Sequence, residues 1–443
     1  MRIELHFPLY LSELTDSKHC NDSLIKFVCT DSRLLQPTDL FIAIKGQTHD
    51  GSSFTEYAKS IAATVVSENQ TADIRVDSIN AFIARLISVY KSKMTALKKT
   101  VAITGSVGKT TTKDVLTKIL SKEFKVHSTK GNQNNLLGTL FTLLSTPNDT
   151  ELLILEFGMN HEGEISVLSK ATHPDLAIIT KIGTAHIGNL GSREMIAKAK
   201  LEIEDGMLGR PVLIPANEPL LRKARNGIPL SFDQKKTAAI NFSCEFETES
   251  GYVYDFSYKD THCKIKITQN DKRLAYAIGF SLATCKLLGA NLDSIADIIP
   301  TLSNHEFRQK LIEKNGYKIY DDTYSSSYEA VLCVVDHLID EYGEISCVLA
   351  DMHELGVFSE QIHTRLGIEL AKRNIKNLYL CGAYAESIAK GLQASSIHFY
   401  INQSTVTYET TLNQIKKSYN GEVLLIKGSH GTHTERLINL LIN

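Results

Sequence analysis

Residues 101–113 constrain the fold of this chain more than any other stretch. The apolar run 101–103 passes into a turn that contains Gly105 and Gly108 and leads at once to Lys109. A buried strand that delivers a glycine turn to the start of a helix brings backbone N–H groups and the positive end of the helix dipole to phosphate oxygens. The stretch therefore predicts a phosphate-binding loop between a strand and a helix.

The side chains of this loop suit a nucleoside triphosphate. Lys109 would neutralise the β and γ phosphates, and the Thr110 hydroxyl would hold a magnesium ion. The common pattern also wants a glycine five residues before Gly108, where Ile103 stands. The alternative is an ordinary strand–turn–helix corner, but strand, glycines, lysine and hydroxyls all follow in order. The predicted ATP-binding residues here are Gly105, Ser106, Gly108, Lys109, Thr110 and Thr111.

Length and composition indicate an ordinary globular protein. A chain of 443 residues has room for roughly two to four domains. Lys plus Arg number 48 against 50 for Asp plus Glu, so charge gives no case for nucleic acid or an anionic membrane as partner. The eight cysteines form no C-x-x-C pair, which favours reduced thiols. With neither a signal peptide nor a membrane span in view, we expect a cytoplasmic protein and, by default, a monomer.

Two further polar side chains follow predicted strands of the same region. Glu156 ends the apolar run 152–155, and His186 comes shortly after the run 177–180. Because parallel strands end at one edge of a sheet, both should converge on Lys109 and Thr110. A carboxylate and a hydroxyl suit magnesium, and an imidazole can serve a second metal position. Taken singly, Glu156 could instead cap a helix and His186 could be a hydrogen-bonded loop histidine.

The rest of the chain indicates an α/β protein of three domains. Residues 1–82 read as a small α/β domain, residues 83–302 as a central parallel-sheet ATPase domain with appended antiparallel strands, and residues 303–443 as a Rossmann-like domain. The third domain has no G-x-G-x-x-G, so a dinucleotide is not implied. The polar cluster 30–33 fits a surface turn as well as a diphosphate site. In the helix capped by Ser192, Lys198 and Lys200 cannot share a face, and either could be solvated.

In this order, the motifs resemble the Mur ligase family over nearly the whole chain. The branch that adds D-alanyl-D-alanine is matched most closely, through Asp-Met-x-Glu-Leu-Gly, Lys-Gly-Ser and the Asp-Ser-Arg entry. The matching segments are 31–33 (DSR), 50–51 (DG), 104–111 (TGSVGKTT), 131–135 (GNQNN), 156–160 (EFGMN), 163–165 (GEI), 185–186 (AH), 198–203 (KAKLEI), 351–356 (DMHELG) and 427–429 (KGS).

The resemblance implies a reaction. In the family, one domain binds a UDP-sugar substrate, a central domain binds ATP, and a C-terminal domain closes on the nucleotide. ATP phosphorylates a substrate carboxylate, and an amine then attacks the acyl phosphate to give a peptide bond, ADP and phosphate. The implied substrates are UDP-N-acetylmuramoyl-tripeptide, D-alanyl-D-alanine and ATP, which places the reaction in peptidoglycan precursor synthesis.

The family also implies roles for individual residues. Thr110 and Glu156 would bind a first magnesium ion and His186 would help bind a second, while Lys200 occupies the position that is carbamylated in the family. Lys109, His186 and Lys200 are therefore the expected catalytic residues, and the expected metal set is Thr110, Glu156, His186 and Lys200. The remaining matches are Asp31, Ser32 and Arg33 for the uridine diphosphate, Asn134 and Asn135 for the muramyl peptide, Arg308 and Asp322 for ATP, and Tyr324 for substrate.

Several positions depart from the family pattern. Ser325-Ser326-Ser327-Tyr328 stands in place of Asn-Ala-Asn-Pro. The departures at the other positions are Phe307 for a glycine, Ala275 and Tyr276 at the place of an asparagine near the adenine, and Lys181 for an asparagine. These positions serve adenine and amine recognition in the family, so two alternatives to the implied function stay open. The chain could be a related ligase for another carboxylate or amine, or a nucleotide-binding homologue without ligase activity.

Overall fold

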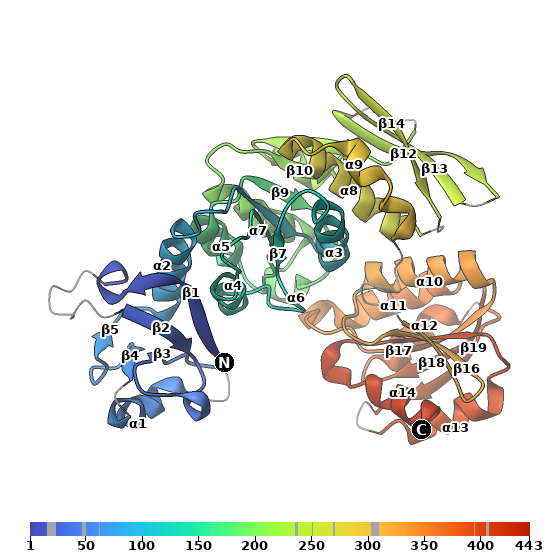
Figure 1. The fold of residues 1–443 in the computed structure, drawn as a ribbon. Coiled ribbons are helices and arrows are strands. Elements are labelled where there is room, and N and C mark those ends of the chain that lie inside the picture. Colours follow the sequence, from blue (N-terminus) through green and yellow to red (C-terminus); the bar gives the residue numbers. More distant parts are fainter. Residues whose placement is uncertain are drawn as a thin grey trace.

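The chain forms three α/β domains, each built on its own sheet (Figure 1), which confirms the expected fold class. The computed structural model describes residues 1–15, 24–46, 50–61, 63–234, 238–249, 251–268, 271–302, 310–393, 395–404 and 407–443. Across these ranges no helix is both long and apolar enough to cross a bilayer. In Figure 1 the N-terminal domain, in blue, and the C-terminal domain, in orange and red, lie on two sides of the green central domain.

The N-terminal domain holds a five-stranded sheet in the order β1-β2-β3-β4-β5. Only β1 runs antiparallel to its neighbour. Helix α1 packs against β4, and a short 3-10 turn, Ser32–Leu34, follows β2. The elements are β1 (Arg2–Tyr10), β2 (Leu24–Cys29), β3 (Leu40–Ile42), α1 (Thr55–Ser60), β4 (Thr64–Ser67) and β5 (Ile74–Arg75).

The central sheet has nine strands in the order β14-β13-β12-β11-β10-β9-β6-β8-β7. Strands β6 to β12 are parallel. Strands β12, β13 and β14 form the antiparallel extension that the alternating residues 240–272 predict. The strands are β6 (Lys99–Thr104), β7 (Val126–Ser128), β8 (Leu152–Glu156), β9 (Leu176–Ile179), β10 (Val212–Pro215), β11 (Gly227–Ser231), β12 (Ile240–Thr248), β13 (Gly251–Tyr258) and β14 (Thr261–Ile267).

Helices cover both faces of the parallel part of this sheet. Side chains of one strand alternate between faces, so Val101 and Ile103 of β6 pack in the cluster that contains α3 and α8, while Ala102 packs in the cluster that contains α2, α4 and α5. Helix α8 ends at Leu288, and its C-cap Gly289 has φ of 80°. The helices are α2 (Ile79–Ser92), α3 (Lys109–Leu120), α4 (Leu136–Leu144), α5 (Glu164–Thr172), α6 (Ile187–Leu190), α7 (Arg193–Leu201), α8 (Lys272–Leu288) and α9 (Leu292–Ala296).

The C-terminal domain has a six-stranded sheet in the order β15-β16-β20-β17-β18-β19. Only β15 is antiparallel, so the carboxyl ends of the other strands share one edge. The elements are β15 (Lys310–Lys314), β16 (Tyr317–Asp322), α10 (Tyr328–Tyr342), β17 (Ile345–Ala350), α11 (Ser359–Leu370), β18 (Ile375–Cys381), α12 (Ala385–Leu392), β19 (His398–Asn402), α13 (Glu409–Ser418), β20 (Val423–Lys427) and α14 (Glu435–Ile442).

One predicted helix is shorter than its pattern suggested. The apolar spacing predicts a helix over residues 79–98, but α2 ends at Ser92. The backbone N–H of Lys98 donates to the Glu151 carbonyl, 2.8 Å away, because the chain must be extended here to enter β6. The boundary predicted after residue 82 falls within α2, and the one after residue 302 precedes residues that the structure does not describe.

Candidate active site

The predicted phosphate loop joins β6 to α3. Gly108, directly before the helix, has φ of 89°, and Gly105 has φ of 147°. A Cβ atom on Gly105 would lie 1.9 Å from the Thr180 hydroxyl oxygen, so no larger residue fits. The Ser106 N–H donates to the Lys181 carbonyl over 2.8 Å and ties the loop to the segment after β9. The loop is thus a tight cradle at the N-terminus of a 12-residue helix, as phosphate binding requires.

A buried carboxylate stands beside the loop, where the sequence predicted it. Glu156, 2% exposed, ends β8, the strand next to β6. Its Oε2 accepts a hydrogen bond from Thr110 Oγ1 over 2.7 Å, and its Oε1 accepts one from Asn134 Nδ2 over 3.0 Å. The Lys109 ammonium donates to the Gly105 carbonyl over 2.7 Å. The hydroxyl and the carboxylate are therefore already placed to share one cation.

Lys200 is a buried lysine next to this group. It is 1% exposed on α7, whereas Lys198 on the same helix is solvent-exposed and pairs with Glu162. No described residue forms an ion pair with Lys200. Burial lowers the pKa of the Lys200 amine well below its ordinary value of 10.5, and the charge of Lys109 lowers that pKa further. The sequence pattern allowed both Lys198 and Lys200 to be solvated, but only Lys198 is; Lys200 is buried beside the phosphate loop.

His186 meets the C-terminal domain. It has a left-handed backbone, φ of 66°, directly before α6, and its Nδ1 lies against the Glu354 carboxylate. The contact with His186 is the main reason that the pKa of Glu354 lies below its ordinary value. The Gly188 N–H also donates to the Glu354 carbonyl over 2.9 Å. Glu354 belongs to the quoted DMHELG motif, yet nothing in the sequence predicted that it would face His186.

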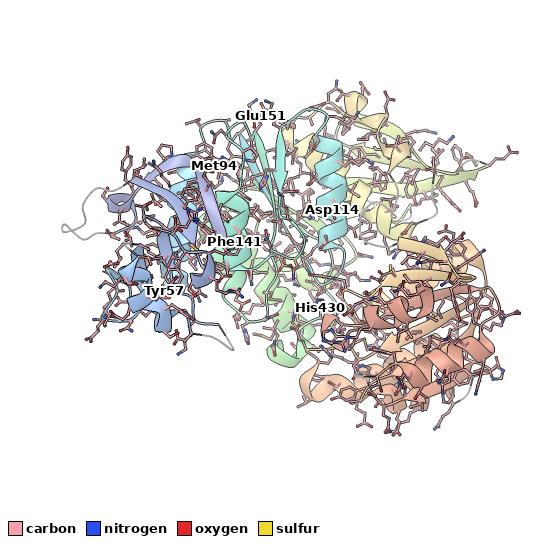
Figure 2. The ribbon with its side chains drawn as sticks, turned by 60° about the horizontal axis from the view of Figure 1, so that its bottom comes forward. Tyr57, Met94, Asp114, Phe141, Glu151 and His430 are labelled. Carbon is pink, nitrogen blue, oxygen red and sulfur yellow. The ribbon has the colours of Figure 1, made fainter. Side chains whose placement is uncertain are left out.

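A cavity of about 890 Å³ lies between the central and C-terminal domains. The central domain lines it with the loop, the end of β8 and the segment after β9. Among these residues are Ser106, Lys109, Thr110, Asn134, Glu156 and His186. The C-terminal domain faces them with the ends of β16 and β20 and the loop after β17. Its residues include Asp322, Tyr324, Ser326, His353, Glu354 and His430. In Figure 2 His430 lies where these two domains meet.

Lys427 organises the C-terminal wall of this cavity. The residue is 1% exposed. Its ammonium donates to Asp322 Oδ2 over 2.8 Å and to the Ser325 carbonyl over 2.6 Å. Asp322, which the resemblance implies for ATP, is thus held by a lysine of the quoted KGS motif. Tyr324 lines the cavity and is 39% exposed. The buried Ser326 hydroxyl has no hydrogen-bond partner among the described residues.

A second contact between the domains was not predicted. The Glu329 carboxylate, in the first turn of α10, accepts hydrogen bonds from the Thr184 N–H over 3.1 Å and from the Thr184 hydroxyl over 3.0 Å. A Cβ atom on Gly183 would lie 2.8 Å from the same carboxylate. No motif in the sequence marks Glu329, because an acid in the first turn of a helix is common for local electrostatic reasons.

Some predicted site residues do not reach the cavity. Asp31, Ser32 and Arg33 lie in the N-terminal domain, where Arg33, its side chain 86% exposed, forms an ion pair with Asp31 over 2.7 Å. Asn135 does not line the cavity either; its side chain caps α4 by accepting the Gly138 N–H over 2.8 Å. Arg308 lies outside the described residues.

Aromatic residues occupy the place where the family pattern has an asparagine. Tyr276 of α8 lines the cavity and stacks on Phe232, with ring centroids 3.6 Å apart and planes inclined by 15°. Burial raises the pKa of Tyr276 to about 12, although a hydrogen bond with Asn217 opposes the increase. Asn217 lines the same part of the cavity. Where the family pattern has an asparagine, this chain therefore places the Tyr276 ring in the cavity wall, stacked on Phe232.

The residues present fit a magnesium nucleotide. Among the described residues no three or more His, Cys, Asp or Glu side chains gather at a metal-binding distance. A cation at Thr110 and Glu156 would need further oxygen ligands from a phosphate and water, which is how magnesium is usually held beside ATP. The glycine cradle and the buried Ser106 hydroxyl, which has no hydrogen-bond partner among the described residues, supply groups that could bind phosphate at the same place.

Comparison with known proteins agrees with this geometry. The sequence model of the Mur ligase family, catalytic domain, matches residues 24–105, that of the Mur ligase middle domain matches residues 103–278, and that of the Mur ligase, glutamate ligase domain, matches residues 307–430. The UDP-N-acetylmuramoyl-tripeptide--D-alanyl-D-alanine ligase of Bacillus subtilis (strain 168) is 31% identical, over 95% of this chain and 94% of that protein. The ligase of the same name from Escherichia coli (strain K12) is 27% identical, over 97% and 98%.

Solved structures resemble the whole chain. A crystal structure of MurF from Acinetobacter baumannii has a TM-score of 0.87 and 25% identity, covering 99% of this chain and 100% of that one. MurF ligase from Thermotoga maritima in complex with ADP has a TM-score of 0.79 and 26% identity, covering 94% and 96%. Three matching domains in series, a relative above 30% identity across nearly the full length and the phosphate loop at the domain interface all agree: this chain belongs to the Mur ligase family.

Proposed function

We propose that the chain is an ATP-dependent ligase that joins UDP-N-acetylmuramoyl-tripeptide to D-alanyl-D-alanine, through an acyl phosphate, in the synthesis of peptidoglycan precursors. The observation that carries the proposal is the cavity in which the phosphate loop and Glu156 face the 351–356 and 427–429 motifs of the C-terminal domain. The relatives that bear this name match the chain over more than nine-tenths of its length.

The first step needs charge neutralisation. A substrate carboxylate and the γ-phosphate of ATP repel each other, so they react only where positive charge surrounds both. In this proposal the loop N–H groups and the α3 dipole bind the phosphates, and Lys109 exchanges its hydrogen bond with Gly105 for one with a phosphate oxygen. A carboxylate oxygen then attacks the γ-phosphorus, the bond to the β-phosphate oxygen breaks, and ADP leaves.

Magnesium would supply Lewis-acid charge stabilisation at this point. Thr110 and Glu156 would hold a first ion, and His186 would help to hold a second. Lys200 would complete the site as a carbamate, since its lowered pKa favours the neutral amine that reacts with carbon dioxide. A carbamate would turn this buried neutral amine into a negatively charged oxygen ligand, which suits a place beside Lys109 and two cations.

The second step joins the amine. The neutral amine of D-alanyl-D-alanine attacks the carbonyl carbon of the acyl phosphate, a C–N bond forms, phosphate leaves, and the amine loses a proton. Residues of the C-terminal wall, with Tyr324 among them, would orient this substrate. The contacts of Glu329 with Thr184 and of Glu354 with His186 would hold that wall against the nucleotide and keep water away from the reactive acyl phosphate.

The proposal assigns each domain a task. Residues 1–82 would bind the UDP-sugar, with Asp31, Ser32 and Arg33 at the diphosphate; residues 83–302 would bind ATP; and residues 303–443 would close on the nucleotide and bind the dipeptide. Asn134 and Asn135 would serve the muramyl peptide, and Asp322 and Arg308 the nucleotide. We also propose that the enzyme acts as a cytoplasmic monomer, as the absence of a membrane-spanning helix among the described residues and the free thiols permit.

A phosphate-release assay tests the proposal. The purified protein is incubated with ATP, Mg²⁺ and UDP-N-acetylmuramoyl-tripeptide, with and without D-alanyl-D-alanine. We expect phosphate and ligated product in equal amounts only with the dipeptide, and neither from Lys109→Ala.

A second candidate is a ligase for another amine. It is favoured by Ser326, whose hydroxyl has no hydrogen-bond partner among the described residues and which lies where the family segment differs. Other dipeptides or amino acids in the same assay would reveal such an activity. No phosphate with any amine would favour a nucleotide-binding homologue.

A further inference from the structure

A second cavity lies at the opposite end of β6 from the phosphate loop. It encloses about 340 Å³ and is lined by α2, the segment that enters β6, and the end of α5. It shares no lining residue with the interdomain cavity. In Figure 2 Met94, one of its lining residues, lies where the N-terminal domain meets the central domain, far from His430 in that view.

The charges around this cavity are positive on balance. Four cationic side chains, Lys91, Lys98, Lys99 and the adjacent Arg210, stand against Asp175 and Glu151. Lys98 pairs with Glu151 over 2.6 Å, and Asp175 lies 3.7 Å from both Lys99 and Arg210. The two carboxylates are thus already neutralised by three cations.

Lys91 is the cation that remains. No described residue forms a hydrogen bond or an ion pair with its ammonium. Burial lowers the pKa of Lys91; the charge of Asp175 partly opposes this and that of Arg210 adds to it. A partly buried ammonium without a partner is unfavourable in the unliganded protein, and an anion in the cavity would relieve that cost.

A buried hydroxyl lies in the wall of the same cavity. Thr100 is fully buried, and its Oγ1 has no hydrogen-bond partner among the described residues. In β6 the side chain of Thr100 lies on the same face as Ala102, which packs in the cluster that contains α2 and α5. Thr100 is also one of the residues that line the cavity, so its hydroxyl is a potential donor in the cavity wall.

We infer that this cavity binds a small oxyanion, a phosphate or carboxylate group, through the Lys91 ammonium and the Thr100 hydroxyl. The second ring nitrogen of His173, whose Nδ1 contacts the Gly206 carbonyl at 2.9 Å, is available at the rim. Because α2 leads from the N-terminal sheet into β6, a bound anion ties the two domains together at their junction. The site is independent of the proposed ligase reaction.

Binding is measured in a Lys109→Ala background, which weakens phosphate binding at the loop by removing its ammonium. Inorganic phosphate and succinate are titrated separately, with the unfolding temperature as readout, because a ligand that binds only the folded state raises it. We expect a saturable increase with a dissociation constant on the order of 1 mM for at least one of them. The tighter of the two identifies the head group. An unchanged unfolding temperature with both anions would overturn the inference.

Two variants locate the site. Lys91→Met should weaken binding about tenfold, the loss of one charge-assisted hydrogen bond, whereas Lys122→Met, at an exposed lysine after α3, should leave it unchanged. Thr100→Val should weaken binding roughly fivefold, yet raise the unfolding temperature of the unliganded protein because it removes an unpartnered buried hydroxyl.

Thr139→Val is the matched control for Thr100. Thr139 of α4 is also fully buried with an unpartnered hydroxyl, but it does not line this cavity. The Thr139→Val substitution should raise the unfolding temperature and leave the anion affinity unchanged. Equal affinity in Lys91→Met and the parent, or loss of all phosphate binding in the Lys109→Ala background, would contradict the site. Crystals soaked in selenate would then show anomalous density elsewhere rather than beside Lys91.

Discussion

Thr110 Oγ1 donates a hydrogen bond to Glu156 Oε2 over 2.7 Å, although the two residues lie 46 positions apart. They meet because β6 and β8 are parallel neighbours, with Ile103 paired in register with Glu156. The hydroxyl and the carboxylate that we propose as ligands of one metal ion are thus held together by the fold. Binding a cation would replace a hydrogen bond rather than rearrange the chain, which is the kind of preorganisation that favours catalysis.

Glu156→Gln should separate metal binding from folding. The amide keeps the size of the side chain but removes the charge, so we expect kcat/KM to fall about 100-fold or more and more Mg²⁺ to be needed. The control is Glu151→Gln, next to the other end of β8, which should leave activity near that of the parent. Steady-state phosphate release at several Mg²⁺ concentrations measures both. Unchanged Mg²⁺ dependence in Glu156→Gln would refute a metal role for this residue.

Lys200→Met should be more stable and inactive. The substitution replaces a buried amine, whose pKa is lowered by desolvation, by an apolar chain of similar length. Folding then no longer has to desolvate and deprotonate this group, and we expect the free energy of unfolding to rise by about 1–3 kcal/mol. Urea denaturation measures the gain, and phosphate release measures the loss of activity. Lys198→Met should change stability by less than about 1 kcal/mol, because Lys198 forms only an exposed ion pair. Full activity in Lys200→Met would exclude Lys200 from the reaction.

Asp271 should link stability to acid pH. Although burial opposes its charged form, the charge and hydrogen bonds of Arg273 hold the pKa of Asp271 below its ordinary value of 3.8. A carboxyl group with a lowered pKa in the folded state stabilises the fold above its unfolded pKa and loses that contribution as pH falls through the folded pKa. We therefore expect Asp271 to add stability at neutral pH that decreases progressively as the pH falls below about 4.

Asp271→Asn tests this link. At pH 7 it should lower the free energy of unfolding by about 3 kcal/mol, since Arg273 loses its ionic partner in a buried site. The Arg273 guanidinium also donates to the Tyr320 hydroxyl of the C-terminal domain, 3.3 Å away, so Asp271 helps to position a contact between domains. Denaturation curves from pH 7 down to pH 3 should converge for parent and variant. A constant difference at every pH would contradict the assignment.

Glu329→Ala should loosen the contact between the central and C-terminal domains. It removes the acceptor for both hydrogen bonds from Thr184, so we expect a larger radius of gyration in small-angle X-ray scattering and a several-fold higher KM for D-alanyl-D-alanine. Glu344→Ala, at a mostly exposed residue near the start of β17, is the matched control. If scattering and KM both equal those of the parent, the contact does not hold the domains.

The central part of the site could be predicted because its signals are local. Gly105, Gly108, Lys109 and Thr110 follow one another in a strand–turn–helix unit, and the structure places them as predicted. Asn134 and Asn135 show the limit of such reasoning. Both match the same motif, yet Asn134 bonds to Glu156 while Asn135 caps a helix, because adjacent side chains at a helix start point in different directions.

The amino-acid sequence determined the order of strands and helices, the phosphate loop, the metal-type side chains that follow β8 and β9, and the likeness to Mur ligases. Hydrophobic periodicity and glycine chemistry act within a few residues, so they can be read along the chain. Only the tertiary structure decided that Lys200 is buried and that Glu354 meets His186. It also decided that the Lys91 ammonium and the Thr100 hydroxyl have no hydrogen-bond partner among the described residues. Those facts depend on how distant segments pack, and their energies come from desolvation and from contacts that no local pattern encodes.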